Sequence, residues 1–160
     1  DTLYIGIDLK NTQISFSADI YHYLKIGKRS VFLSGLKAGS LINDNLFLND
    51  LYRIGGLKSL RGFNERSFFA SIYSVGTLEY RFFTDETSYL LLFYDQGYLT
   101  YDLLDNTFYE DFPLGLGAGI SFSTKAGIFN FIYSVGRSKA EDQPIGLNFS
   151  KIHFGLISHF

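Results

Sequence analysis

Residues 12–26 read TQISFSADIYHYLKI, and apolar residues alternate with polar ones along almost the whole stretch. The even positions carry Ile14, Phe16, Ala18, Ile20, Leu24 and Ile26, and the odd positions carry Gln13, Ser15, Ser17, Asp19 and Lys25. A two-residue period is typical of a β-strand with one apolar and one polar face. This stretch therefore predicts one long strand, with His22 as an exception on the apolar side.

The same period recurs along the chain and predicts an all-β, antiparallel protein. The eight predicted strands span residues 2–9, 12–26, 28–40, 70–83, 88–101, 115–124, 127–137 and 149–160. Most are longer than the usual globular strand of about 5–6 residues and reach the roughly 9–11 residues that a tilted strand needs to cross a bilayer. Strand length therefore favours a transmembrane β-barrel over a soluble sandwich.

The connections between these strands alternate in length. They are short at 27–28, 84–87 and 125–126, and long at 41–69, 102–114 and 138–148. Outer-membrane barrels have short periplasmic turns and longer external loops, so the C-terminus is expected in the periplasm. The connection at 10–11 departs from this rule because it is short where an external loop is expected.

The polar face has the composition of a barrel lumen. On the predicted strand 115–124, Gly115, Gly117, Gly119 and Ser121 alternate with apolar residues. A strand surface exposed to water would carry more charges, lysine especially. Aromatic residues near strand ends fit an interfacial girdle. Alternation alone still leaves a soluble barrel, with its apolar face inward, as an alternative.

Composition excludes several classes of function. The formal net charge of −2 argues against a nucleic-acid partner, and the lack of cysteine removes thiolate chemistry. The three histidines, 22, 153 and 159, are too scattered to predict a metal site, and no cofactor is expected. The acidic residues of the connections are expected on a solvated surface: Asp102, Asp105, Glu110, Asp111, Glu141 and Asp142.

One connection has an unusual composition. Residues 55–63 read GGLKSLRGF, followed downstream by LEYR at 78–81 and FYDQG at 93–97. In this order, the motifs resemble the C-terminal barrel region of the BamA/TamA-type outer-membrane assembly and translocation superfamily. That superfamily also includes two-partner secretion transporters and barrels fused to patatin-like lipases. The resemblance covers residues 50–160 well and the earlier strands by spacing only.

The resemblance implies that the 41–69 loop folds into the barrel lumen. Its arginine, Arg61, followed by Gly62 and Phe63, would pair there with Glu79 and Asp95. Strand phase agrees, because Glu79 alternates with Leu78 and Tyr80, and Asp95 with Tyr94 and Gln96. Both carboxylates should therefore point inward, where a bidentate arginine can satisfy them. Three glycines of the loop are expected to permit positive φ angles and close backbone contact: Gly55, Gly56 and Gly62.

Two segments depart from the pattern of that superfamily. Residues 124–127 read TKAG where a proline is frequent, and Asn130 and Ile132 stand where an inward Arg and Asp are usual. The last strand keeps an amphipathic pattern ending in a terminal aromatic residue. Its apolar positions resemble the signal by which assembly machinery recognises outer-membrane substrates: Ile152, Phe154, Leu156 and Phe160.

The number of strands bears on the size of the barrel. An eight-stranded barrel is just filled by its own side chains, so it has no room for an internal loop. We therefore expect residues 1–160 to be one barrel domain that forms the C-terminal half of a sixteen-stranded barrel. The absence of methionine also indicates a processed or excised piece.

The expected function is non-enzymatic assembly, insertion or translocation of other outer-membrane or secreted proteins. The expected partners are outer-membrane lipid, unfolded substrate proteins and periplasmic accessory proteins, in a Gram-negative-type bacterium or derived organelle. Two alternatives stay open: the membrane anchor of an outer-membrane enzyme such as a patatin-like lipase, and a small eight-stranded structural barrel. No G-x-S-x-G occurs in the chain, so such an enzyme would carry its active site elsewhere.

Overall fold

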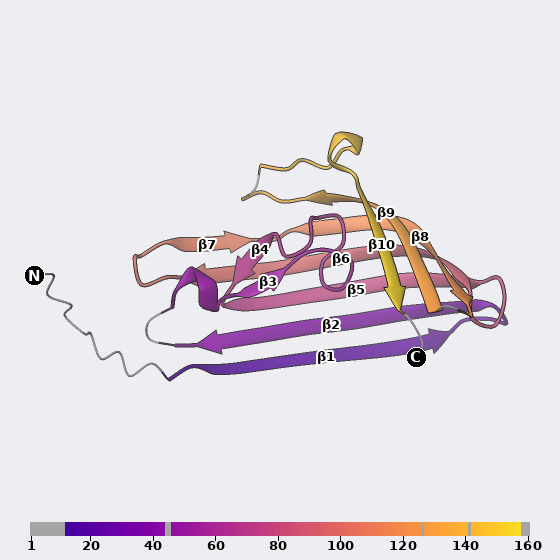
Figure 1. Cartoon of the computed structure of the whole chain (residues 1–160), viewed down its shortest axis with the longest axis horizontal. Coiled ribbons are helices and arrows are strands. Elements are labelled where there is room, and N and C mark those ends of the chain that lie inside the picture. The colour runs from indigo at the N-terminus through magenta and orange to yellow at the C-terminus, as the bar shows by residue number, and fades with distance from the viewer. Residues whose placement is uncertain (1–11, 44–45, 126, 141, 158–160) are drawn as a thin grey trace, which may run out of the picture.

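The computed structural model describes residues 12–43, 46–125, 127–140 and 142–157 (Figure 1). An eight-stranded antiparallel sheet dominates it, in the order β1-β2-β5-β6-β8-β9-β10, with β7 paired to β6. Its strands are β1 (Ile14–Lys25), β2 (Ser30–Ile42), β5 (Ile72–Phe83), β6 (Tyr89–Asp102), β7 (Phe108–Asp111), β8 (Leu114–Thr124), β9 (Gly127–Arg137) and β10 (Lys151–Ile157). Within the described residues, β1 and β10 are the two ends of the sheet, which does not close.

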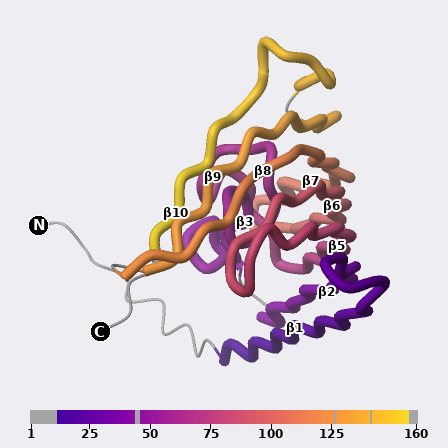
Figure 2. The backbone as a smooth tube through the Cα atoms, turned by 90° about the vertical axis from the view of Figure 1, so that its right-hand side faces the viewer, coloured from indigo at the N-terminus to yellow at the C-terminus, as the bar shows by residue number. Residues whose placement is uncertain are grey.

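The chain between β2 and β5 lies inside the curve of the sheet (Figure 2). It contains a short 3-10 helix, η1 (Leu48–Asp50), and a two-stranded sheet of β3 (Tyr52–Ile54) and β4 (Phe68–Ala70). Leu60, Phe63 and Phe68 of this segment form a buried cluster with Val75 and Leu99, which lie on β5 and β6. The 41–69 loop is therefore a folded unit that packs against the concave face.

The two faces of the sheet differ as their alternation predicts. Ile20, Leu92 and Phe154 point outward and are 64%, 59% and 64% exposed. Leu91 and Phe93, the neighbours of Leu92 on β6, point to the concave side and are buried. Because no side chain of the described residues covers the outward apolar positions, the convex face is the one suited to an apolar solvent.

The strands predicted from residue 12 onward are all present, with two corrections. Residues 102–114 do not form a long loop, since β6 continues to Asp102 and β7 pairs back onto it around a turn closed by the Leu103 N–H and the Thr107 carbonyl. The last strand begins at Lys151, because residues 147–149 form a 3-10 helix, η2 (Leu147–Phe149). The predicted strand 2–9 lies outside the described residues.

Strand register places four residues in one row across the concave face. Thr77 of β5 is opposite Asp95 of β6, Asp95 is opposite Gly115 of β8, and Gly115 is opposite Gly136 of β9. The row therefore runs from a hydroxyl and a carboxylate to two positions without side chains. Among the described residues, no helix is long and apolar enough to span a membrane.

Candidate functional site

Glycines set the path of the 41–69 loop around its arginine. Gly55, Gly56 and Gly62 have φ angles of 123°, 90° and 96°, in the region that favours glycine. The turn between them is closed by the Gly56 N–H, which donates to the Leu60 carbonyl at 2.9 Å. These bends direct the Arg61 side chain toward the concave face of β5 and β6.

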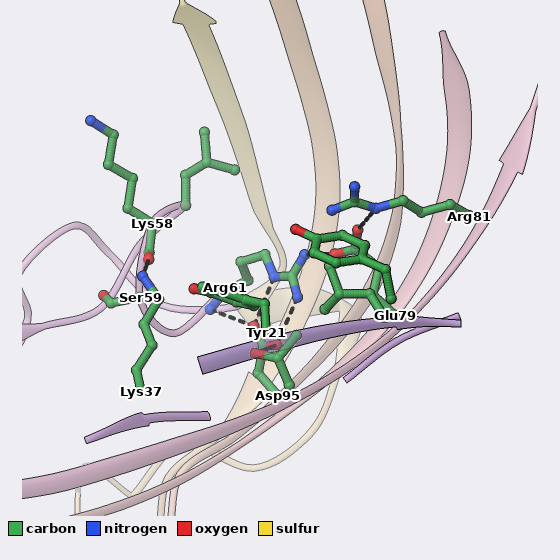
Figure 3. Close-up of a pocket in the computed structure, with 12 residues that line it drawn as sticks. Tyr21, Lys37, Lys58, Ser59, Arg61, Glu79, Arg81 and Asp95 are labelled. Carbon is green, nitrogen blue, oxygen red and sulfur yellow. Dashed lines mark hydrogen bonds and ion pairs between the residues drawn. The ribbon is translucent and has the colours of Figure 1, made fainter. Parts of the chain in front are cut away.

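Arg61 lies between two carboxylates from neighbouring strands (Figure 3). Its Nε and Nη2 donate to Asp95 Oδ2 and Oδ1 at 2.8 and 2.7 Å, which is the bidentate geometry of a guanidinium and a carboxylate. Its Nη1 donates to Glu79 Oε2, and its backbone N–H donates to Asp95 Oδ2 at 3.2 Å. The structure thus brings together the three charged residues that the sequence singled out.

The cluster is buried and electrically balanced. Arg61, Glu79 and Asp95 are 8%, 4% and 1% exposed, and Arg81 donates to Glu79 Oε1 at 2.6 Å. Two guanidinium groups therefore face two carboxylates. Burial would lower the pKa of Arg61, but the hydrogen bonds and negative charges of Asp95 and Glu79 outweigh this effect and raise the pKa above its usual value. The loop arginine is consequently charged at every accessible pH.

Two further side chains support this arrangement, and sequence reasoning missed both. Thr77 Oγ1 donates to Asp95 Oδ1 at 2.9 Å, so the carboxylate accepts from a neighbouring strand as well as from the loop. The Arg61 guanidinium carbon lies 3.7 Å from the centre of the Phe93 ring, a cation–π contact on the concave face. Both residues share the inward phase of Asp95, which was the available signal.

The loop backbone rests on glycines of β8 and β9. A Cβ atom added at Gly115 would lie 1.8 Å from the Arg61 carbonyl oxygen, and one added at Gly136 would lie 2.6 Å from the Gly62 carbonyl oxygen. Any side chain at Gly115 would overlap the loop backbone. Gly115 on the inward face of the predicted strand 115–124 and Gly136 of β9 are thus a surface for the loop, a role that composition alone did not reveal.

The charged cluster also borders a cavity. Arg61, Glu79 and Asp95 line a cavity of about 220 Å³ that also borders Lys37 and Lys58. Lys37 Nζ donates to the Lys58 carbonyl at 2.6 Å, which ties the loop tip to β2. Among the described residues, no group of three His, Cys, Asp or Glu side chains is placed to hold a metal ion.

The remaining predicted positions lie at the end of the sheet. Ile152, Phe154 and Leu156 of β10 point outward and are 65%, 64% and 51% exposed. Phe160 lies outside the described residues. His153, which the sequence did not assign, points inward and is 7% exposed.

One acidic residue was assigned wrongly to the solvated surface. Asp111 is 2% exposed and accepts hydrogen bonds from Ser138 Oγ and from the Lys139 N–H, the latter at 3.2 Å. It therefore fastens the start of the 138–150 connection to β7. The reason is the unexpected strand pairing of β7, which turns Asp111 inward.

The comparison with protein families agrees with this geometry. The family profile of the Omp85 superfamily domain matches residues 2–159, nearly the whole chain. The chain belongs to the Omp85 superfamily. No curated protein matches it. Omp85 proteins are β-barrels of the outer membrane with a general role in assembling or translocating proteins there, and the resemblance drawn from the loop motif is confirmed at this level.

The two β9 residues that depart from the expected pattern both face inward. Asn130 and Ile132 both share the inward phase of Ser134, and Ile132 is 3% exposed. Ile132 packs with Leu91 and Phe93 in a small apolar cluster. At these two positions the concave wall thus carries an amide and an apolar side chain.

Proposed function

We propose that this Omp85 chain works in the insertion or translocation of other outer-membrane or secreted proteins, with the 41–69 loop anchored in the barrel lumen. The observation that carries the proposal is the Arg61 cluster. The buried, balanced ion pairs fix the loop in position on the concave face of the sheet. The opposite, convex face of the sheet is apolar. Arg61, Gly62, Phe63, Glu79 and Asp95 form the anchor, and Gly55 and Gly56 set its approach.

The loop also favours a barrel larger than the described strands. A closed barrel of eight strands is filled by its own side chains, whereas here the concave face holds a folded loop with its own two-stranded sheet. An open sheet edge is not tolerated in lipid, so further strands must pair with β1 and β10 in the membrane. We therefore propose that residues 1–160 form the C-terminal half of a sixteen-stranded barrel.

Orientation follows from the connections. The turns at 26–29 and 84–88 are short, and both lie at the end of the sheet toward which β10 runs. Short turns are periplasmic in outer-membrane barrels. The proposal therefore places the C-terminus in the periplasm, where periplasmic accessory proteins would act on it.

The mechanism that we propose is strand addition at β10. β10 ends the described sheet, so in the complete barrel its other edge would meet the first strand at a seam, and opening of this seam would offer backbone groups to a substrate strand. Such pairing gains affinity from main-chain hydrogen bonds and needs no cofactor. In the biogenesis of this chain, Ile152, Phe154, Leu156 and Phe160 would serve as the signal that assembly machinery recognises.

The test is insertion of an unfolded barrel substrate by the full-length protein in lipid vesicles. Arg61→Ala should release the loop and reduce the insertion rate by at least about tenfold, because breaking a buried ion pair costs about 3 kcal/mol or more. Arg53→Ala is the matched control, since Arg53 is an exposed arginine of the same loop. Wild-type protein without insertion or translocation activity would contradict the proposal and leave an enzyme anchor or structural barrel.

A further inference from the structure

The loop is joined to the last strand as well as to β5 and β6. The Gly62 N–H donates to His153 Nε2 at 3.3 Å, across 91 positions of sequence. His153 is 7% exposed and lies on β10, the strand with an unpaired edge in the described sheet. The contact therefore links the Arg61 segment directly to the strand at which we propose that substrates add.

A second contact lies one inward position further along β10. A Cβ atom added at Gly155 would lie 2.5 Å from Leu57 Cδ2, so the Leu57 side chain occupies the space that Gly155 leaves empty. His153 and Gly155 together give β10 a polar and an apolar contact with the loop. A change in the position of β10 would disturb both contacts.

The polar contact depends on the protonation state of the imidazole. Nε2 accepts a hydrogen bond only in the neutral ring, with the proton on Nδ1. A protonated ring has two donors and no acceptor, so the Gly62 N–H would face another N–H. The contact thus exists above the pH at which His153 protonates and is lost below it.

The charges around His153 are few. Arg61 and Glu65 face it from the loop, and Lys151 is on its own strand. Its partner on β9, Ile132, does not titrate, and neither does Ser134, which pairs with Lys151. Two cations and one carboxylate therefore surround a ring that is nearly shielded from water.

We propose that His153 is a positioning residue that holds the 41–69 loop to β10 only in its neutral form, so that acidification releases the loop from the last strand. This inference rests on the proposed docking of the loop and adds a regulation to it. The ion pairs of Arg61 do not involve His153. Release at β10 would leave the Arg61 anchor in place.

The experiment follows loop motion in the folded full-length protein in vesicles. Residues 1–160 have no cysteine, so Lys58→Cys, at an exposed position of the loop tip, accepts a spin label once any cysteine outside these residues has been replaced. The label should become more mobile between about pH 8 and pH 5, the range in which histidines titrate. Loss of one hydrogen bond should raise the mobile population about fivefold. Far-UV circular dichroism at each pH checks that the barrel is intact.

Histidine variants assign the transition. His153→Gln keeps an acceptor that does not titrate, so its label should stay immobile across the range, and His153→Ala should be mobile throughout. His22→Gln and His159→Gln should keep the wild-type transition. A transition that persists in His153→Gln, disappears in His159→Gln, or is absent from the wild type would overturn the proposal. Insertion activity is measured separately, so loss of this inference and loss of the proposed function are distinguishable.

Discussion

The convex and concave faces of the sheet are built from the same strands and follow different rules. On β6, Leu92 points outward and is 59% exposed, while Asp95, three positions along, is 1% exposed and bound to a loop arginine. The convex face needs only to be apolar, since its neighbour is a fluid. The concave face needs particular residues at particular registers, because its neighbour is another part of the chain.

The difference shows in what each face can lose. Ile20 and Leu92 on the convex face are 64% and 59% exposed, so another apolar residue can replace either of them at little cost. On the concave face, Gly115 and Asp95 contact the backbone and the guanidinium of Arg61 directly. Substitutions on the concave face should therefore disturb docking of the loop, and substitutions on the convex face should leave docking unchanged.

The largest effect is expected at Gly115. In Gly115→Val the new side chain would occupy the position of the Arg61 carbonyl oxygen, so the loop cannot dock and the 41–69 segment should become fully sensitive to protease. Gly76→Val is the control, because a Cβ at Gly76 meets only the Gln96 carbonyl oxygen at 3.9 Å. Equal protease resistance of both variants would refute a docked loop.

Removal of one carboxylate should be the next largest effect. Asp95→Asn keeps the shape but leaves the Arg61 charge half-compensated, and breaking a buried pair in this way costs about 3–5 kcal/mol. We expect the loop to open at a lower denaturant concentration, measured by protease sensitivity across a urea series. Asp102→Asn, at an exposed position of the same strand, should behave as wild type. Matching curves for the two variants would count against the anchor.

A charge on the convex face should act on insertion of the barrel and spare the loop. Leu92→Arg should destabilise the folded protein in lipid by about 2–4 kcal/mol, as for an arginine near the bilayer midplane. Leu92→Ile should cost little. Equilibrium unfolding in vesicles measures both variants, and an arginine tolerated at this position would argue that the convex face does not contact lipid.

The smallest effect is expected at Thr77. Thr77→Val removes the hydrogen bond to Asp95 and keeps the side-chain volume, so loop docking should weaken by about 1 kcal/mol. Thr77→Ser retains the hydroxyl and serves as the control. An effect of Thr77→Val as large as that of Asp95→Asn would mean that the hydroxyl, rather than the arginine, orients the carboxylate.

Most of the fold could be predicted because a two-residue period is a local property. Residues 12–26 and 127–137 show it clearly and match β1 and β9 closely. The hairpin at 102–114 was missed because its alternation is interrupted by a turn and by Pro113, between β7 and β8. The buried position of Asp111 was lost with it, since only strand pairing reveals which way that side chain points.

The charged residues of the site could be identified from the sequence, but the residues that hold the loop beside them could not. Arg61, Glu79 and Asp95 were identified from motif resemblance and strand phase, two kinds of information that need no distances. The contacts of Gly115 and His153 depend on how β8 and β10 lie relative to the loop, which is set by register across several strands. A histidine on an inward phase has no local signal that distinguishes an acceptor from a filler.

The pairing of β3 with β4 lowers the entropic cost of docking the loop. These strands join residues 52–54 to residues 68–70, so the two ends of the segment between them are held together beside the wall. Ordering a chain segment costs conformational entropy, and here much of that cost is met within the segment itself. Docking of the tip therefore has to order fewer independent residues than docking of an open loop of the same length would.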